Sequence, residues 1–323
     1  MHNFLRLTSA VFIFFMTSSC LHAEKAIRIV GSTAVYTFVT MVAERLGQTS
    51  SHKTPIVEAT GTGGGIKIFC GGLGKSYPDI VSTSRPFTSE ERKYCQANGT
   101  GDIIELKIGY DGIVIGGSVK KKSLALTRKD LSRALSEYVN IDGIRTKNPY
   151  NSWKEVNASL PNQPILVLGP TSTLATREVF EEKVIYEGCL LENEDCETTI
   201  REDGKFIEVA EHENVVIQKL GLKPTAIGFV SYSYYSQNPG KLKPIPIDGI
   251  LPSPASIANN TYPLSRPLFL YVKKESLDTS KAIQDFLAEF FSEQASGVHG
   301  YLISKGLIPL NQKDKAFVKL PTR

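Results

Sequence analysis

The sequence predicts an α/β protein built as two lobes, and three observations lead to this prediction. Short β-rich segments alternate with helical patterns along most of the chain, which is typical of a sheet with helices on its faces. The length of 323 residues exceeds that of most single domains. Loops rich in glycine and hydroxyl residues follow predicted strands in both halves of the chain.

The first 23 residues differ from the rest of the chain. An apolar run at 10–16 follows Arg6, and Leu21-His22-Ala23 offers a small residue for cleavage. Because this apolar run is too short to span a bilayer, residues 1–23 are expected to be a cleaved secretory signal. A buried N-terminal helix is one alternative. A lipoprotein anchor at Cys20 is another, although Thr17 stands where a lipoprotein signal has an aliphatic residue.

Periodicity and turn residues place the elements in order. Strands are predicted at 26–30, 55–59, 79–81, 103–108, 113–115, 165–168 and 268–272, helices at 35–46 and 282–291, helix starts at 88–91 and 127–130, and a loop-rich stretch at 244–257. This alternation favours a parallel sheet with helices on both faces. The break between the strands at 103–108 and 113–115 comes from Gly109-Tyr110-Asp111-Gly112.

The chain is expected to leave its first lobe, build the second and return. The crossings are predicted near Tyr110 and Arg266, which gives a discontinuous lobe I of residues 24–110 plus 266–323 and a lobe II of residues 111–265. We find no internal repeat and no low-complexity linker in the sequence.

Removal of the signal would leave an even number of cysteines, which in an oxidising compartment predicts disulfides. Proximity in sequence favours the pairs Cys70–Cys95 and Cys189–Cys196, although four cysteines allow three connectivities. A zinc site is not expected, because the sequence has no Cys-x-x-Cys motif and no paired histidines.

Charge and motifs argue against nucleic-acid binding and against catalysis. The net charge is +4, and no basic run exceeds residues 120–122. A P-loop ending at Gly74-Lys75-Ser76 would need glycine at position 69, which is Phe69, and the dinucleotide fingerprint beginning at Gly61 fails at Ile66. The sequence also lacks a Gly-x-Ser-x-Gly nucleophile elbow. We therefore expect no enzyme, no cofactor and no metal.

Three loops have the composition of anion-binding loops: 31–35, 61–65 and 169–176. Each follows a predicted strand and opens a helix, whose first N–H groups and dipole attract anions. Any one of them could be an ordinary helix cap. Three at successive strand ends favour a shared site, because open α/β sheets bind ligands beyond the carboxyl ends of their strands.

Charged residues near these loops are the next candidates. Arg85 follows the third strand, and its planar guanidinium matches an oxyanion. Arg177 could assist, but a solvent-facing position is favoured. Asp111 is the best candidate for a buried carboxylate; it could accept a proton from hydrogen phosphate or serve as a hinge or cap.

At these loops the sequence resembles the PstS family, the phosphate-binding proteins of bacterial phosphate ABC transporters. The resemblance rests on segments 31–36, 61–67, 84–86, 169–180, 200–204, 265–268 and 305–310, together with Cys189 and Cys196. It covers nearly all of the mature chain. It implies the two-lobed periplasmic-binding-protein fold of type II, with the ligand cleft between the lobes.

The resemblance also implies a ligand set. Phosphate contacts are expected at Thr33, Ala34, Val35, Thr62, Gly63, Ser84, Arg85, Leu174, Ala175 and Thr176. Ala34 replaces a usual threonine, and Leu174-Ala175 replaces Ser-Gly, so at least two hydroxyl donors are lost while the backbone donors remain.

The function implied is that of a monomeric periplasmic receptor that captures inorganic phosphate for the inner-membrane permease subunits of an ABC importer. A divergent binding-fold protein that acts as an oxyanion sensor or secreted surface protein is the alternative. A phosphate-ester hydrolase is the third hypothesis, and it would need a metal cluster or activated nucleophile that the sequence does not show.

Overall fold

The computed structural model describes residues 25–119, 124–169, 171–172, 175–191, 199–209 and 213–311, together with Cys196 and Asp314. The expected signal segment 1–23, with Cys20, lies outside the described residues, as does Leu174. No helix within the described ranges is long and apolar enough to cross a membrane.

Eleven strands occur in the described ranges. They are β1 (Arg28–Gly31), β2 (Ile56–Ala59), β3 (Ile80–Thr83), β4 (Ile103–Gly117), β5 (Tyr138–Ile141), β6 (Ile144–Lys147), β7 (Val167–Gly169), β8 (Phe206–Glu208), β9 (Ile227–Ser231), β10 (Lys243–Pro244) and β11 (Ser265–Lys273). All except the β5–β6 hairpin join one sheet, in the order β2-β1-β3-β11-β4-β9-β7-β8, with β10 on β4.

Helices cover the sheet. They are α1 (Thr33–Thr49), α2 (Thr62–Phe69), α3 (Ser89–Ala97), α4 (Arg128–Leu135), α5 (Trp153–Val156), α6 (Ala175–Phe180), a π-helical turn (Glu181–Tyr186), α7 (Glu187–Leu190), α8 (Glu213–Leu222), α9 (Tyr232–Gln237), α10 (Pro254–Ala258), α11 (Lys274–Thr279), α12 (Lys281–Phe290), α13 (Glu293–Ser296) and a 3₁₀ turn (Ile303–Lys305). The α/β class predicted from the sequence is confirmed.

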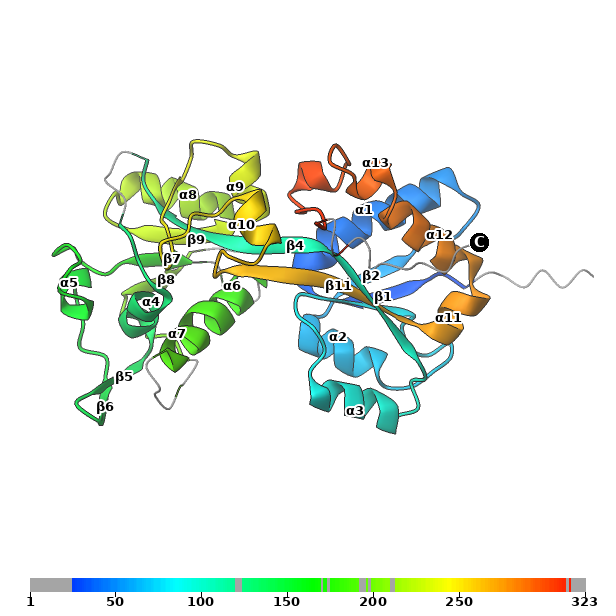
Figure 1. Cartoon of the computed structure of the whole chain (residues 1–323), viewed down its shortest axis with the longest axis horizontal. Helices are drawn as coiled ribbons and strands as arrows, with labels where there is room; N and C mark the ends of the chain where they lie inside the picture. Colours follow the sequence, from blue (N-terminus) through cyan, green and yellow to red (C-terminus); the bar gives the residue numbers. More distant parts are fainter. Residues whose placement is uncertain are drawn as a thin grey trace, which may run out of the picture.

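The elements form two bodies joined by the long strands β4 and β11 (Figure 1). We call the body with β1–β3, α1–α3 and α11–α13 lobe I, and the body with β5–β9 and α4–α10 lobe II. β4 and β11 run antiparallel to each other and to the strands beside them, whereas β1 with its neighbours and β7 with its neighbours are parallel. The sheet is therefore mixed: the predicted parallel pairing occurs within each lobe, whereas β4 and β11 are antiparallel to their neighbours.

The segment Gly109-Tyr110-Asp111-Gly112 does not interrupt the strand. The two strands predicted there are one continuous strand, β4, and it pairs with β11 from Ile103 to Gly112. The irregularity in the sequence appears instead as a register shift, with Leu268 opposite Gly109 and Phe269 opposite Lys107. Such a bulge bends the strands locally without ending them.

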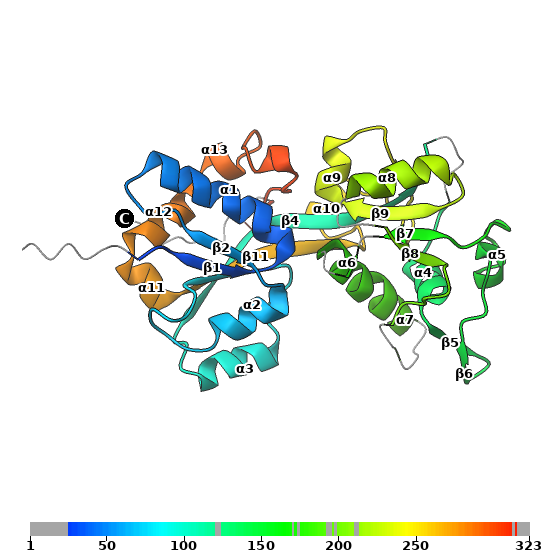
Figure 2. The same ribbon diagram turned by 180° about the vertical axis from the view of Figure 1, so that it is seen from behind.

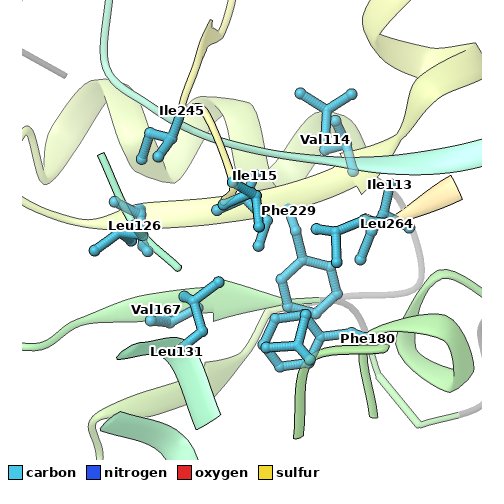
Figure 3. Close-up of a cluster of buried hydrophobic side chains, with 14 of the residues drawn as sticks. Ile113, Val114, Ile115, Leu126, Leu131, Val167, Phe180, Phe229, Ile245 and Leu264 are labelled. Atoms are coloured by element: carbon cyan, nitrogen blue, oxygen red, sulfur yellow. The ribbon is translucent and has the colours of Figure 1, made fainter. Parts of the chain in front are cut away.

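Separate groups of buried side chains stabilise the two bodies. In lobe II, Phe180 and Phe229 stack with ring centroids 4.2 Å apart, among the aliphatic side chains of β4 and β7 (Figure 3). In lobe I, the buried face of α1 packs with β1, β3, β11 and α12. This face consists of Val35, Phe38, Val39, Val42, Ala43 and Leu46, which is the helical spacing that the sequence predicted.

Both expected disulfides are present. Cys70 at the end of α2 bonds to Cys95 of α3, with Cα atoms 4.4 Å apart. Cys189 of α7 bonds to Cys196, with Cα atoms 5.7 Å apart. The first of these bonds ties the end of α2 to α3.

Replacing Gly31 by alanine is expected to lower the free energy of unfolding by more than about 2 kcal/mol. Gly31 ends β1 with φ at 135°, and a Cβ atom there would lie 2.0 Å from the carbonyl oxygen of Ser82. Urea unfolding measures the change. Gly221→Ala in α8 is the matched control, since its Cβ would meet no atom within 4 Å and should be neutral or stabilise by up to about 1 kcal/mol. Equal stability of the two variants would contradict this account.

Candidate functional site

The first predicted loop leads directly into α1. Ser32 is the N-cap, and its hydroxyl accepts the Ala34 N–H at 3.3 Å while its own N–H donates to Ser82 O at 2.9 Å. Thr33 and Ala34 are partly exposed, whereas Val35 is buried. Thr33 and Ala34 are therefore accessible at the start of α1, whereas the Val35 side chain is buried and its N–H already donates to Ser32 O at 3.1 Å.

The second loop opens α2, and its start is open. Gly61 is the N-cap with φ at 72°, and it provides no side-chain cap. A Cβ atom built on Gly61 or Gly63 would meet no atom within 4 Å. Gly65, by contrast, lies so close to Gly31 that its Cβ would be 2.6 Å from the Gly31 Cα. The glycines thus place the first turn of α2 against the end of β1 with room in front of its amides.

The end of β3 is joined to the start of α2. The Thr62 hydroxyl lies 3.0 Å from the Ser84 hydroxyl and accepts the Ser84 N–H at 3.3 Å. Thr62 and Ser84 are both buried. These two predicted site residues, 22 positions apart in sequence, therefore form one contact.

Arg85 is held by an acid that the sequence analysis did not assign to the site. Its Nη1 donates to Glu91 Oε2 and its Nη2 to Glu91 Oε1, both at 2.8 Å, and Nη1 also donates to Pro86 O. Burial opposes the ionisation of Glu91, but hydrogen bonds from Arg85 and Thr88 hold its pKa below the ordinary value. The bond to Glu91 raises the pKa of Arg85.

This arrangement uses only one edge of the guanidinium. Glu91 takes the Nη1–Nη2 edge of Arg85, which leaves the edge formed by Nε and the second hydrogen of Nη2. Within the described ranges, Arg85 Nε makes no hydrogen bond that we identify, and the side chain is partly exposed. Two parallel N–H groups on such an edge match two oxygens of a tetrahedral anion.

The third loop leads into α6. The Thr176 hydroxyl donates to Glu213 Oε1 at 3.1 Å, and Glu213 also accepts the N–H and the hydroxyl of Ser231, at 2.5 and 2.8 Å. Burial raises the pKa of Glu213, although these hydrogen bonds act against the rise. The Thr176 hydroxyl is thus engaged within lobe II, and α6 offers backbone groups to a ligand. The side chain of Ala175 is outside the described part of the structure.

The three helix starts face one another. α1 and α2 begin on the side of lobe I that is turned toward α6, in both views (Figures 1 and 2). Residues of α1 lie within 8 Å of residues of α6, measured between Cα atoms. Arg85 of lobe I interacts electrostatically with Glu178 of α6 and Glu182, which follows it. The predicted residues of the two lobes are therefore neighbours.

Acidic residues also border this region. Burial raises the pKa of Glu178, Arg266 opposes the rise, and Glu182 adds to it. The Glu178 side chain nevertheless reaches solvent. A carboxylate that interacts with both Arg266 and Arg85 would repel an anion bound beside them when it is ionised.

Arg177 does not face solvent, contrary to the expectation from the sequence. It is buried, donates to Glu181 Oε1 and Glu208 Oε1 at 2.8 Å each, and lies over the ring of Phe206. Arg177 therefore anchors α6 to β8, and its charge is already paired. Arg177 precedes Phe180 by three residues, so the two side chains share one face of α6. This spacing was the signal that could have indicated that Arg177 is buried.

Four residues near the helix starts, Glu91, Glu178, Glu213 and Arg266, were not assigned to the site from the sequence. Glu91 was recognised only as part of a capping box, which the structure confirms. Glu213 and Arg266 are distant in sequence from the residues they contact, and no local pattern marks them.

Comparison with known proteins gives independent information. A model of the PBP superfamily domain matches residues 19–294. A protein named SphX from Synechococcus elongatus is 28% identical over 289 residues, covering 88% of this chain and 77% of the relative. A phosphate-binding protein PstS from Staphylococcus epidermidis is 29% identical over 283 residues, covering 85% and 77%.

Solved structures are similar over nearly the whole chain. The crystal structure of a possible phosphate binding protein from Planctomyces limnophilus has a TM-score of 0.70 at 25% identity, covering 91% of this chain and 96% of that one. An ABC-type phosphate transport receptor from Vibrio cholerae has a TM-score of 0.64 at 21% identity, covering 87% and 99%. The two-lobed type II periplasmic-binding-protein fold is confirmed, and the chain belongs to the family of the PBP superfamily domain.

Proposed function

We propose that this chain is an extracytoplasmic solute-binding protein that captures inorganic phosphate for an ABC importer. Relatives named as phosphate-binding proteins support the ligand class, and a similar structure described as an ABC-type phosphate transport receptor supports the role. The proposed ligand groups are the amides at the starts of α1, α2 and α6, the hydroxyls of Thr33, Thr62 and Ser84, and the guanidinium of Arg85.

The observation that carries the proposal is the free edge of Arg85 beside the open start of α2. The end of β3, which bears Ser84 and Arg85, is hydrogen-bonded to Thr62 at that start. A tetrahedral anion placed there would meet a bidentate cation and uncapped helix amides together. A cationic solute would be repelled by Arg85, and a neutral solute would lack the charge-assisted hydrogen bonds that an anion makes.

Capture is proposed to occur in a cleft between a discontinuous lobe I, residues 24–110 plus 266–323, and a lobe II, residues 111–265. The separate buried clusters and the strands β4 and β11 that join the two bodies support these boundaries. An anion that contacts helix starts of both lobes would favour the closed arrangement through its additional contacts.

The remaining parts of the proposal concern location and partners. A cleaved signal at residues 1–23 would deliver the mature chain to the periplasm as a monomer. Lobe closure would then create a composite surface for the permease subunits. Deletion of the gene and growth on limiting phosphate separates this transport role from that of a sensor or surface protein.

Isothermal titration calorimetry on the mature chain, residues 24–323, tests phosphate capture. We expect one site with a dissociation constant of about micromolar or below for phosphate. No heat of binding with millimolar phosphate or sulfate would contradict the proposal. A colorimetric phosphatase assay on the same sample should give no turnover.

Replacing Glu178 by glutamine is expected to raise phosphate affinity by about 2- to 5-fold at pH 8, a small effect because Glu178 is exposed. The Glu178 carboxyl, whose pKa is raised, is ionised and repels the anion above that pKa, and it is neutral below it. The ratio of variant to wild-type affinity should therefore rise with pH. Calorimetric titrations of both proteins at several pH values measure this ratio. The protonation of phosphate also changes with pH, but it changes equally for the two proteins and therefore cancels in the ratio.

Glu44→Gln, in the middle of α1 and exposed, is the control and should leave the ratio at one throughout. A ratio that falls with rising pH in Glu178→Gln would show that this carboxylate does not face the anion.

A further inference from the structure

A pocket of about 100 Å³ opens at the outer end of lobe II, where β4 ends and β9 begins. β4 leaves its pairing with β11 at Gly112 and runs on beside β9 to Gly117, about 17 Å further at the rise of an extended strand. This end of the sheet points away from lobe I in both views (Figures 1 and 2). The pocket is therefore separate from the candidate anion site.

The pocket has an apolar floor and a polar mouth. Among its lining residues, Leu124, Ile227 and Ile245 are buried and form the floor. Thr225 and Lys243 are exposed and stand at the mouth, and Gln163 beside them is partly exposed. This arrangement suits a small ligand that is apolar at one end and polar at the other.

Two polar side chains at the mouth keep their hydrogen-bonding groups for a ligand. Within the described ranges, neither the Thr225 hydroxyl nor the Gln163 side-chain amide makes a hydrogen bond that we identify. The backbone beside them is fixed: the Gln163 carbonyl accepts the Trp153 N–H at 2.9 Å, and the Ala226 N–H donates to Lys223 O at 2.9 Å. A hydroxyl and an amide NH₂ can both donate to an oxygen of a ligand.

The charge around the pocket has one sign. Residues 112–129, 156–177 and 214–247 are the three stretches of chain that contain its lining residues, and none of them has an aspartate or a glutamate. The last stretch has four lysines, at positions 219, 223, 241 and 243. A region with lysines and no nearby acid in sequence attracts anions. The polar end of the ligand is therefore expected to be negatively charged.

The volume limits the size of the ligand. A cavity of about 150 Å³ can hold benzene, so this pocket holds about four non-hydrogen atoms with the charged end at the mouth. Inorganic phosphate has no apolar part to cover the floor. A long acyl chain would not fit inside.

We propose that this pocket is a second binding site, which takes a short aliphatic carboxylate of about three to five carbons. The alkyl chain packs on Leu124, Ile227 and Ile245, and the carboxylate accepts hydrogen bonds from Lys243 and Thr225. This inference goes beyond the proposed function, because it assigns a different ligand to a different part of lobe II.

NMR titration of the ¹⁵N-labelled mature chain with butyrate tests the site, with excess phosphate present to occupy the anion site. We expect saturable shifts of the amide resonances of residues 117–118 and 225–227, with a dissociation constant of about 1 mM. No saturable shift there up to about 50 mM butyrate, or shifts only at 33–35 and 62–63, would overturn the inference. A failure of phosphate itself to bind would contradict the proposed function and leave this test valid.

A ligand series tests the size and the charge of the ligand. Acetate should bind about 10-fold more weakly than butyrate, because two fewer methylene groups are buried. 1-Butanol, which has no charge, should bind about 3- to 10-fold more weakly. Octanoate should bind no more tightly than butyrate. An affinity that keeps rising with chain length would show adsorption to an open apolar surface and would overturn the inference.

Lys243→Gln tests the residue assigned to the carboxylate. Butyrate affinity should fall by about 3- to 10-fold, while 1-butanol affinity should stay unchanged. The fold should be retained, because Lys243 is exposed. An equal loss for butyrate and 1-butanol would show that Lys243 only shapes the pocket, and no loss for either would remove it from the site. Either result would overturn the assignment.

Lys241→Gln is the matched control. Lys241 is also exposed and changes the net charge equally, but it does not line the pocket and its Nζ donates to Asn238 Oδ1 at 2.8 Å. Its substitution should leave butyrate affinity within about 2-fold of the wild type. Equal losses in Lys241→Gln and Lys243→Gln would show that the general charge of lobe II, and not the pocket, attracts the carboxylate.

Discussion

Replacing Arg85 by alanine is expected to weaken phosphate binding by about 100-fold or more, because two charge-assisted hydrogen bonds to the anion are lost together. The fold should be retained, since Arg85 is partly exposed and α3 keeps its Thr88–Glu91 capping box. Calorimetric titration measures the affinity, and urea unfolding measures the stability. Arg85→Lys should recover only part of the affinity, because an ammonium group lacks the planar edge.

A double-mutant cycle with Glu91 shows whether this acid acts through Arg85. Glu91→Gln alone should weaken binding by about 3- to 10-fold, because the guanidinium is held less firmly. In the Arg85→Ala background the same change should have no further effect on affinity. If Glu91→Gln weakened phosphate binding equally in the wild type and in Arg85→Ala, Glu91 would influence the site by another route. If Arg85→Ala bound phosphate as tightly as the wild type, Arg85 would not be a ligand group.

Replacing Gly63 by aspartate is expected to weaken phosphate binding by at least about 100-fold while leaving the protein as stable as the wild type or more so. The new side chain would enter the open space in front of α2 and place a carboxylate where the anion is proposed to bind. An acid in the first turn of a helix also stabilises it through the dipole. Loss of binding with no loss of stability is a combination that misfolding cannot produce.

Gly63→Asn is the control for size. It adds a side chain of the same shape without the charge, so it should weaken binding much less than aspartate does. If aspartate and asparagine gave equal affinities, charge at the start of α2 would not matter, and the helix start would not be an anion site.

Much of the fold could be predicted from local sequence patterns. The apolar spacing of Val35, Phe38, Val39, Val42 and Leu46 predicted the buried face of α1, and Thr88 with Glu91 predicted the start of α3. Turn residues were less reliable. Gly109 and Gly112 indicated a break, but pairing with β11 keeps β4 extended through both. Contacts between distant strands decided the conformation there, and a local pattern contains no information about them.

Parts of the candidate site could likewise be predicted from local sequence, and other parts could not. Loops 31–35 and 61–65 were recognisable because glycine and hydroxyl residues before a helix have a local chemical meaning. The ion pair of Asp111 with Arg266 joins residues 155 positions apart, and the bond from Thr176 to Glu213 spans 37 positions. Each partner taken alone is an ordinary charged residue, so only the assembled sheet shows that they border the helix starts.

The central claim is that amides from both lobes surround one anion, and titration of the ¹⁵N-labelled mature chain with phosphate tests it most directly. We expect the largest shifts of amide resonances in three places: residues 33–35 with 62–63, residues 84–85, and residues 174–176. All should follow one binding curve. Shifts confined to a single lobe, or different curves for the two lobes, would contradict a site shared between them.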